Sequence, residues 1–132
     1  MNATNDRTTF DRRATAFSPR IKSDWTQSRQ IVREICVERA RAVFLATRWT
    51  VLLETAADSA SRTLAETTRL ELRMAVRRYA RLLLELGEPR SQSLLLVAEL
   101  AAEVARHNGW DAAAADDLRD EIVEWAMDVS PT

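Results

Sequence analysis

Residues 62–86 read RTLAETTRLELRMAVRRYARLLLEL, and this stretch decides the fold class of the chain. Because each helical residue turns the chain by about 100°, most of its apolar side chains fall within one arc of about 120°. These are Leu64, Leu72, Ala75, Val76, Tyr79, Leu82, Leu83 and Leu86. Thr63 and Glu66 fit a capping box at the start, and Gly87 followed by Pro89 ends the pattern. We predict a helix whose apolar arc faces a core.

The opposite side of this helix is basic. Arginines recur at every fourth position and form a slowly drifting ridge, and three apolar side chains project among them. An apolar side chain inside a basic face is typical of an interface. We therefore predict that a protein partner binds this face, and that the partner is a second copy of the chain. The predicted partner-binding residues are Arg69, Leu70, Arg73, Met74, Arg77, Arg81 and Leu84.

A first long helix is expected before this one, from Ser23 or Asp24 to about Glu54. Its early apolar face comprises Val32, Ile35, Cys36, Ala40 and Val43. From Ala42 to Leu53, apolar residues including Phe44, Trp49 and Val51 surround the helix, so we expect burial on most sides. A break near Thr47 to Thr50 is the alternative to one continuous helix.

Two shorter helices are expected after Gly87. The first runs from Ser91, as its cap, to His107, with Asn108 and Gly109 ending it; it buries Leu94, Val97, Leu100, Ala101, Val104 and Ala105. The second is capped by Asp111 and buries Ala115, Leu118, Ile122, Trp125 and Ala126. Together the four segments predict an all-α protein, an antiparallel four-helix bundle of two long helices followed by two shorter ones.

The N-terminal segment has a different composition. Residues 1–22 hold five basic and two acidic side chains without a sustained apolar period, which is typical of disorder. We expect a flexible basic N-terminal arm followed by one helical domain over residues 23–129. The domain keeps 14 of the 19 basic and 18 of the 20 acidic residues.

Deleting residues 1–22 is expected to lower the melting temperature by less than about 4 °C, because the arm has few apolar anchors to offset the entropy of ordering it. Calorimetry of the full and shortened chains measures the difference. A larger drop would indicate that Phe10 or Phe17 docks on the bundle.

Few side chains in this sequence are suited to catalysis. The chain has one histidine and one cysteine, and no P-loop, nucleophile-elbow, zincin or dinucleotide motif. Glu99, Glu103 and His107 share a helical face, but their spacing differs from the Glu-x-x-His ligands of di-iron bundles, so we read them, with the carboxylate pair Glu34 and Glu38, as solvated side chains. No metal or cofactor is predicted.

The remaining chemically distinctive residues are interpreted as core. Cys36 lies on an apolar face and reads as a small core residue. The four tryptophans, Trp25, Trp49, Trp110 and Trp125, read as packing residues, with a ligand cavity as the alternative.

The basic helix and the last helix have opposite charge. Residues 111–128 contain seven acids and one base, Arg119. The simplest arrangement places the basic helix against this acidic helix, within one chain or between two. The acidic charge of the domain argues against nucleic acid as the partner.

No membrane span is expected, since the longest apolar runs are far too short to cross a bilayer. The N-terminus lacks the apolar run of a signal peptide, and the single cysteine suits a reducing compartment, so we expect a cytoplasmic protein. The function predicted is that of a non-catalytic interaction or regulatory module. The alternatives are a small helical enzyme or metal- or cofactor-binding bundle, and a nucleic-acid-binding protein.

Overall fold

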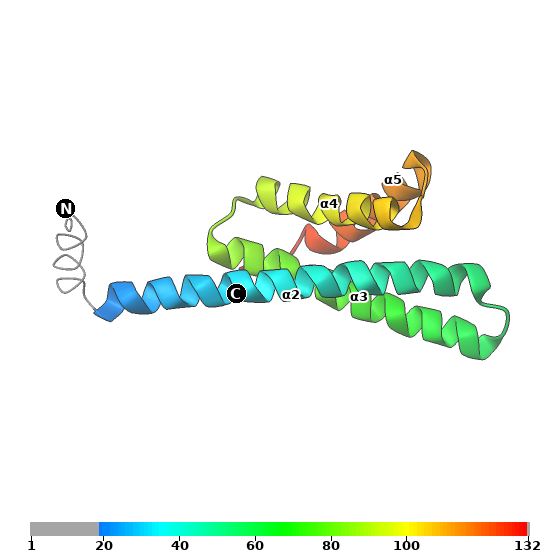
Figure 1. Ribbon diagram of the computed structural model, residues 1–132, viewed down its shortest axis with the longest axis horizontal. Helices are drawn as coiled ribbons and strands as arrows, with labels where there is room; N and C mark the ends of the chain where they lie inside the picture. The colour runs from blue at the N-terminus through cyan, green and yellow to red at the C-terminus, as the bar shows by residue number, and fades with distance from the viewer. Residues whose placement is uncertain (1–18, 132) are drawn as a thin grey trace. The chain divides into compact units, whose positions relative to one another are not determined.

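The computed structural model describes the backbone of residues 19–131 and the side chains of residues 25–131. It contains four helices, α2 (Pro19–Thr55), α3 (Ser59–Leu86), α4 (Arg90–Asn108) and α5 (Ala112–Ala126) (Figure 1). The described residues contain no strand. The predicted all-α class, with two long helices and then two shorter ones, is confirmed.

The described residues divide between two compact units, one that ends at residue 30 and one that begins at residue 31. The expected flexible arm lies mostly in residues 1–18, outside the described residues. In the first unit, Trp25 is exposed and the Arg29 guanidinium lies 4.8 Å from the centre of its ring. The prediction that Trp25 packs in a core is therefore wrong, since its side chain is 63% exposed and the contact with Arg29 comes from a residue one turn further along the same helix.

The start of α2 lies earlier in the chain than the sequence predicts. The helix begins at Pro19 rather than at Ser23 or Asp24, because proline suits the first helical position, where its missing N–H leaves no bond unmade. Deleting residues 1–22 would thus remove the first turn of α2. The helix is continuous through Thr47 and Thr50, whose hydroxyls donate to the carbonyls of Val43 (3.0 Å) and Thr47 (2.8 Å).

The start of α3 also differs from the prediction. Asp58, rather than Thr63, caps the helix, and its Oδ1 accepts a hydrogen bond of 2.8 Å from the backbone N–H of Ser61. Because Asp58 is extended and Ser59 is already helical, Thr63 falls inside the helix, where its hydroxyl donates to the carbonyl of Ser59. The cap therefore lies five residues before the predicted one.

Replacing Asp58 with alanine should lower stability at neutral pH, and the loss should shrink in acid. The hydrogen bond from Ser61 lowers the pKa of the Asp58 carboxyl from its ordinary value of 3.8. A lowered pKa in the folded state means that the stabilisation is present above pH 3.8 and is lost as the pH falls through the folded value. Thermal unfolding between pH 7 and pH 3 measures this. Asp58→Asn keeps an acceptor oxygen without titrating, so the difference in stability between Asp58→Asn and Asp58→Ala should not change with pH. A loss in Asp58→Ala that is the same at pH 7 and pH 3 would contradict the assignment.

The ends of α3 and α4 and the start of α5 lie where the sequence predicts them. Gly87 has the left-handed φ of 109° and its N–H bonds to the carbonyls of Leu83 and Leu84, as predicted for a helix end. Gly109 ends α4 with φ 66°, and Asp111 caps α5 by accepting 2.9 Å from the N–H of Ala114. The cap of α4 was predicted wrongly. Ser91 is already helical, and Pro89 stands at the cap position without a side-chain bond.

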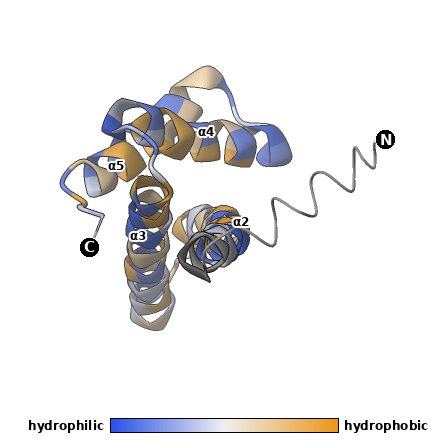
Figure 2. Cartoon of the chain, turned by 90° about the vertical axis from the view of Figure 1, so that its left-hand side faces the viewer, coloured by the Kyte–Doolittle hydropathy of each residue, from blue (hydrophilic) through white to orange (hydrophobic). Residues whose placement is uncertain are grey.

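The core lies in the second unit, where α4 and α5 pack on each other and both contact α3 (Figures 1 and 2). The part of α2 from residue 31 onward contributes Ala42, Leu45, Ala46 and Trp49 to the same cluster. Side chains of α3, α4 and α5 that are almost completely buried include Leu72, Val76, Val97, Leu100, Val104 and Ile122. The arc predicted for α3 is buried at six of its eight positions, Leu72, Ala75, Val76, Tyr79, Leu82 and Leu83.

Several predicted core positions are exposed. On α2, burial on most sides is wrong, because Phe44, Val51 and Leu53 are exposed. Ala40 and Phe44 each lie two residues from the buried Ala42 and are therefore turned about 200° away from it around the helix. Because only one side of α2 faces the core, both residues are exposed. The other predicted core positions that are exposed are Val32 and Cys36 on α2 and Leu64 in the second turn of α3.

Candidate functional site

Arg69, from the predicted basic face of α3, binds α5. Its Nη2 lies 3.0 Å from Oε2 of Glu121, and its guanidinium carbon lies 5.3 Å from the centre of the Trp125 ring. Arg69 is therefore held by a carboxylate and an aromatic face at once, and it ties α3 to α5.

Arg77, two turns further along α3, also binds α5. Its Nη1 donates to Oδ1 of Asp128 (2.7 Å) and to the carbonyl of Trp125 (2.8 Å). The bond from Arg77 lowers the pKa of the Asp128 carboxyl. Two of the predicted partner-binding arginines thus meet the acidic helix of their own chain, which is one of the arrangements left open by the sequence.

The middle of the α3 face remains on the surface. Met74 is 72% exposed and Leu70 is 49% exposed, and Arg73 between them has no ion pair with any described residue. Leu84 differs from this group, because it is half-buried and packs against the core. We call Leu70, Arg73, Met74 and Arg81 the outer face of α3.

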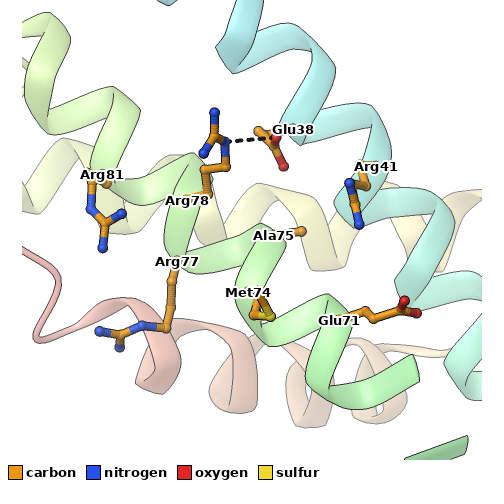
Figure 3. Close-up of a pocket in the computed structure, with 8 residues that line it drawn as sticks. All are labelled: Glu38, Arg41, Glu71, Met74, Ala75, Arg77, Arg78 and Arg81. Carbon is orange, nitrogen blue, oxygen red and sulfur yellow. Dashed lines mark ion pairs between the residues drawn. The ribbon is translucent and has the colours of Figure 1, made fainter. Parts of the chain in front are cut away.

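A groove runs along this part of α3 and is completed by α2 (Figure 3). Its volume is about 550 Å³, and its lining residues are Glu38, Arg41, Glu71, Met74, Ala75, Arg77, Arg78 and Arg81. Figure 3 shows Arg78 turned toward α2, where its Nε lies 3.0 Å from Glu38 Oε2. The Arg78 Nη2 lies 3.6 Å from Glu34. Sequence reasoning missed Arg41 and Arg78, since only the antiparallel pairing of α2 with α3 places them here.

Two of the arginines that line the groove have no ion-pair partner among the described residues. Among the described residues, neither Arg41 nor Arg81 has an ion pair, and the buried Nε of Arg81 has no hydrogen-bond partner. A buried donor without an acceptor costs free energy. The groove therefore offers cationic donors beside the exposed apolar side chain of Met74 to a molecule with acidic and apolar groups.

The acidic sets noted in the sequence have structural partners. Glu103 forms an ion pair with Arg39 of α2 and lies 3.7 Å from Nε2 of His107. Within residues 25–131, no three His, Cys, Asp or Glu side chains are grouped closely enough to hold a metal ion. Cys36 is exposed, so its reading as a core residue is wrong.

The remaining tryptophans pack in or against the core. Trp49 and Trp125 are buried, with ring centres 6.3 Å apart and planes tilted by 45°, and Trp110 packs against the same cluster. The predicted packing role is confirmed for these three residues.

Comparison of the chain with protein-family models, with curated proteins and with solved structures finds no match. No helix in the described part of the chain has the length and apolarity needed to span a membrane.

Proposed function

We propose that this chain is a non-catalytic interaction or regulatory module that self-associates through the outer face of α3. The observation that carries the proposal is the exposure of Met74 and Leu70, one turn apart, beside arginines with no ion pair among the described residues. Methionine and arginine are both enriched at protein interfaces. A second copy is the proposed partner because two-fold homodimers are the commonest oligomers.

The apolar members supply most of the proposed affinity. Complete burial of a Leu or Met side chain contributes about 1.5–3 kcal/mol, whereas an exposed ion pair contributes about 0–1 kcal/mol. Leu70 and Met74 therefore provide stability, and Arg73 and Arg81 provide orientation and a faster encounter. Because Arg69 and Arg77 form ion pairs within their own chain, fewer arginines of α3 are available to the partner than the sequence indicated.

Sedimentation equilibrium of the full chain over a wide concentration range tests self-association. We expect a reversible monomer–dimer equilibrium that weakens little in high salt, since the contact is mainly apolar. A monomer at every concentration would remove the proposal.

Catalysis or cofactor carriage is the rival class of function. Elemental analysis and an absorption spectrum of the protein from its native host separate the two classes, because a stoichiometric metal or chromophore would overturn the non-catalytic assignment. A cytoplasmic location is part of the proposal, and the exposed thiol of Cys36 suits a reducing compartment.

A further inference from the structure

A second concave region lies between the last turns of α2 and the first half of α5, within the second unit. Its volume is about 470 Å³, and it is largely open to solvent. Its apolar walls are Trp49, Leu53, Trp110 and Leu118. Leu53 is exposed, although it lies beside the buried core, and Trp110 is half-buried. Both side chains line this cleft. We call it the tryptophan cleft.

The polar lining of the tryptophan cleft is acidic. Glu54, Asp111, Asp117 and Glu121 contribute carboxylates, and none of its lining residues is basic. Glu121 forms an ion pair with Arg69, and one oxygen of Asp111 caps α5. Within the described residues, Glu54 and Asp117 have no ion pair. Two free carboxylates therefore stand at the edge of an aromatic surface.

The protein already holds one cation by this combination of groups. The Arg69 guanidinium lies over Trp125 and against Glu121, and Glu121 also lines the cleft. The Trp125 ring is in turn 6.3 Å from the ring of Trp49, a wall of the cleft. A tryptophan face attracts a cation through its negative quadrupole, and a nearby carboxylate adds Coulomb attraction. The tryptophan cleft also combines tryptophan rings with carboxylates, but no cationic side chain among the described residues lines it.

We propose that the tryptophan cleft binds a small organic cation with a flat apolar body. The ammonium or amidinium group lies beside Asp117 and Glu54, and the apolar body packs against Trp49, Trp110 and Leu53. An inorganic cation would gain nothing from the apolar walls, and a neutral aromatic would gain nothing from the carboxylates. The proposal does not depend on self-association, since none of these residues belongs to the outer face of α3.

Three probes separate the two contributions in isothermal titration calorimetry of the full chain. The first, 2-phenylethylamine, carries both a ring and an ammonium group. The second, 2-phenylethanol, keeps the ring without the charge, and the third, ethylamine, keeps the charge without the ring. We expect saturable one-to-one binding of 2-phenylethylamine with a Kd below about 1 mM, and at least about tenfold weaker binding of the other two probes.

Exposed residues provide variants that leave the fold intact. Asp117→Asn should weaken binding of 2-phenylethylamine about fivefold, the order expected for one partly solvated charge pair, and Leu53→Ser should weaken it through the lost apolar contact. Glu124→Gln is the matched control, because Glu124 is an exposed carboxylate of the same helix that does not line this cleft. It should bind like the wild type.

Each outcome decides the proposal. Tight binding of 2-phenylethylamine that is lost in Asp117→Asn and Leu53→Ser but kept in Glu124→Gln supports it. The absence of saturation, equal binding of ethylamine, or an equal loss in Asp117→Asn and Glu124→Gln overturns it, since each of these shows either no site or attraction to diffuse negative charge. A chain that binds the probe as a monomer would retain this inference and lose the proposed self-association.

Discussion

Replacing Leu72 with alanine is expected to lower the free energy of unfolding by about 2–5 kcal/mol, because the side chain is 1% exposed and its removal leaves a cavity in the core. Leu70→Ala, two residues away on the same helix, should change it by no more than about 0.5 kcal/mol in the monomer, since that side chain is 49% exposed and lies outside the core. Urea unfolding at low protein concentration measures both values.

The comparison of Leu70→Ala with Leu72→Ala tests which side of α3 faces the core. Both variants delete the same atoms from the same helix, so differences in helix propensity cancel. Similar losses for Leu70→Ala and Leu72→Ala would mean that α3 is rotated about its axis from the described position, and the outer face of α3 would then be wrong as well.

Met74→Asp is expected to raise the dissociation constant of the dimer by at least about tenfold, because it replaces an apolar contact with a charge that must lose its water. Arg73→Ala should raise it by about fivefold or less, the value of one exposed ion pair. Sedimentation equilibrium of the two variants beside the wild type measures these changes. Met74 is 72% exposed, so the aspartate should leave the folded monomer intact.

Met127→Asp is the matched control for this comparison. Met127 is an exposed methionine that follows α5 and lines a different groove, between α4 and α5. We expect a wild-type dimer from this variant. Dissociation by Met127→Asp, with no effect of Met74→Asp, would move the interface to the α4–α5 side and leave the outer face of α3 solvated.

The sequence determined the features that depend on neighbouring residues along the chain. The spacing of Leu72, Val76, Tyr79 and Leu83 fixes one side of a helix, whatever lies opposite. Gly87 and Gly109 end their helices because each can adopt a positive φ, and Asp111 caps α5 through a bond to a residue three positions later. These are local geometries, and they were predicted correctly.

Local reasoning was less accurate where several local solutions compete. Thr63 and Asp58 both offer a cap for α3, and Pro19 and Asp24 both offer a start for α2. The sequence pattern favours the later position in each case. The helices instead extend to the earlier one, since each added residue gains a backbone hydrogen bond once a helix has formed.

Only the tertiary structure decided how the charges and the second helix face are used. Arg69 and Glu121 are 52 residues apart in the chain, and no periodicity within α3 distinguishes Arg69, which binds α5, from Arg73, which does not. Phe44 and Val51 have the composition of core residues, yet they are exposed because the neighbours of α2 cover the side that carries Ala42 and Trp49. The tryptophan cleft likewise joins Trp49 and Leu53 to Asp117. Burial and pairing depend on which surfaces meet, and helical spacing specifies directions around one axis without specifying what lies in each direction.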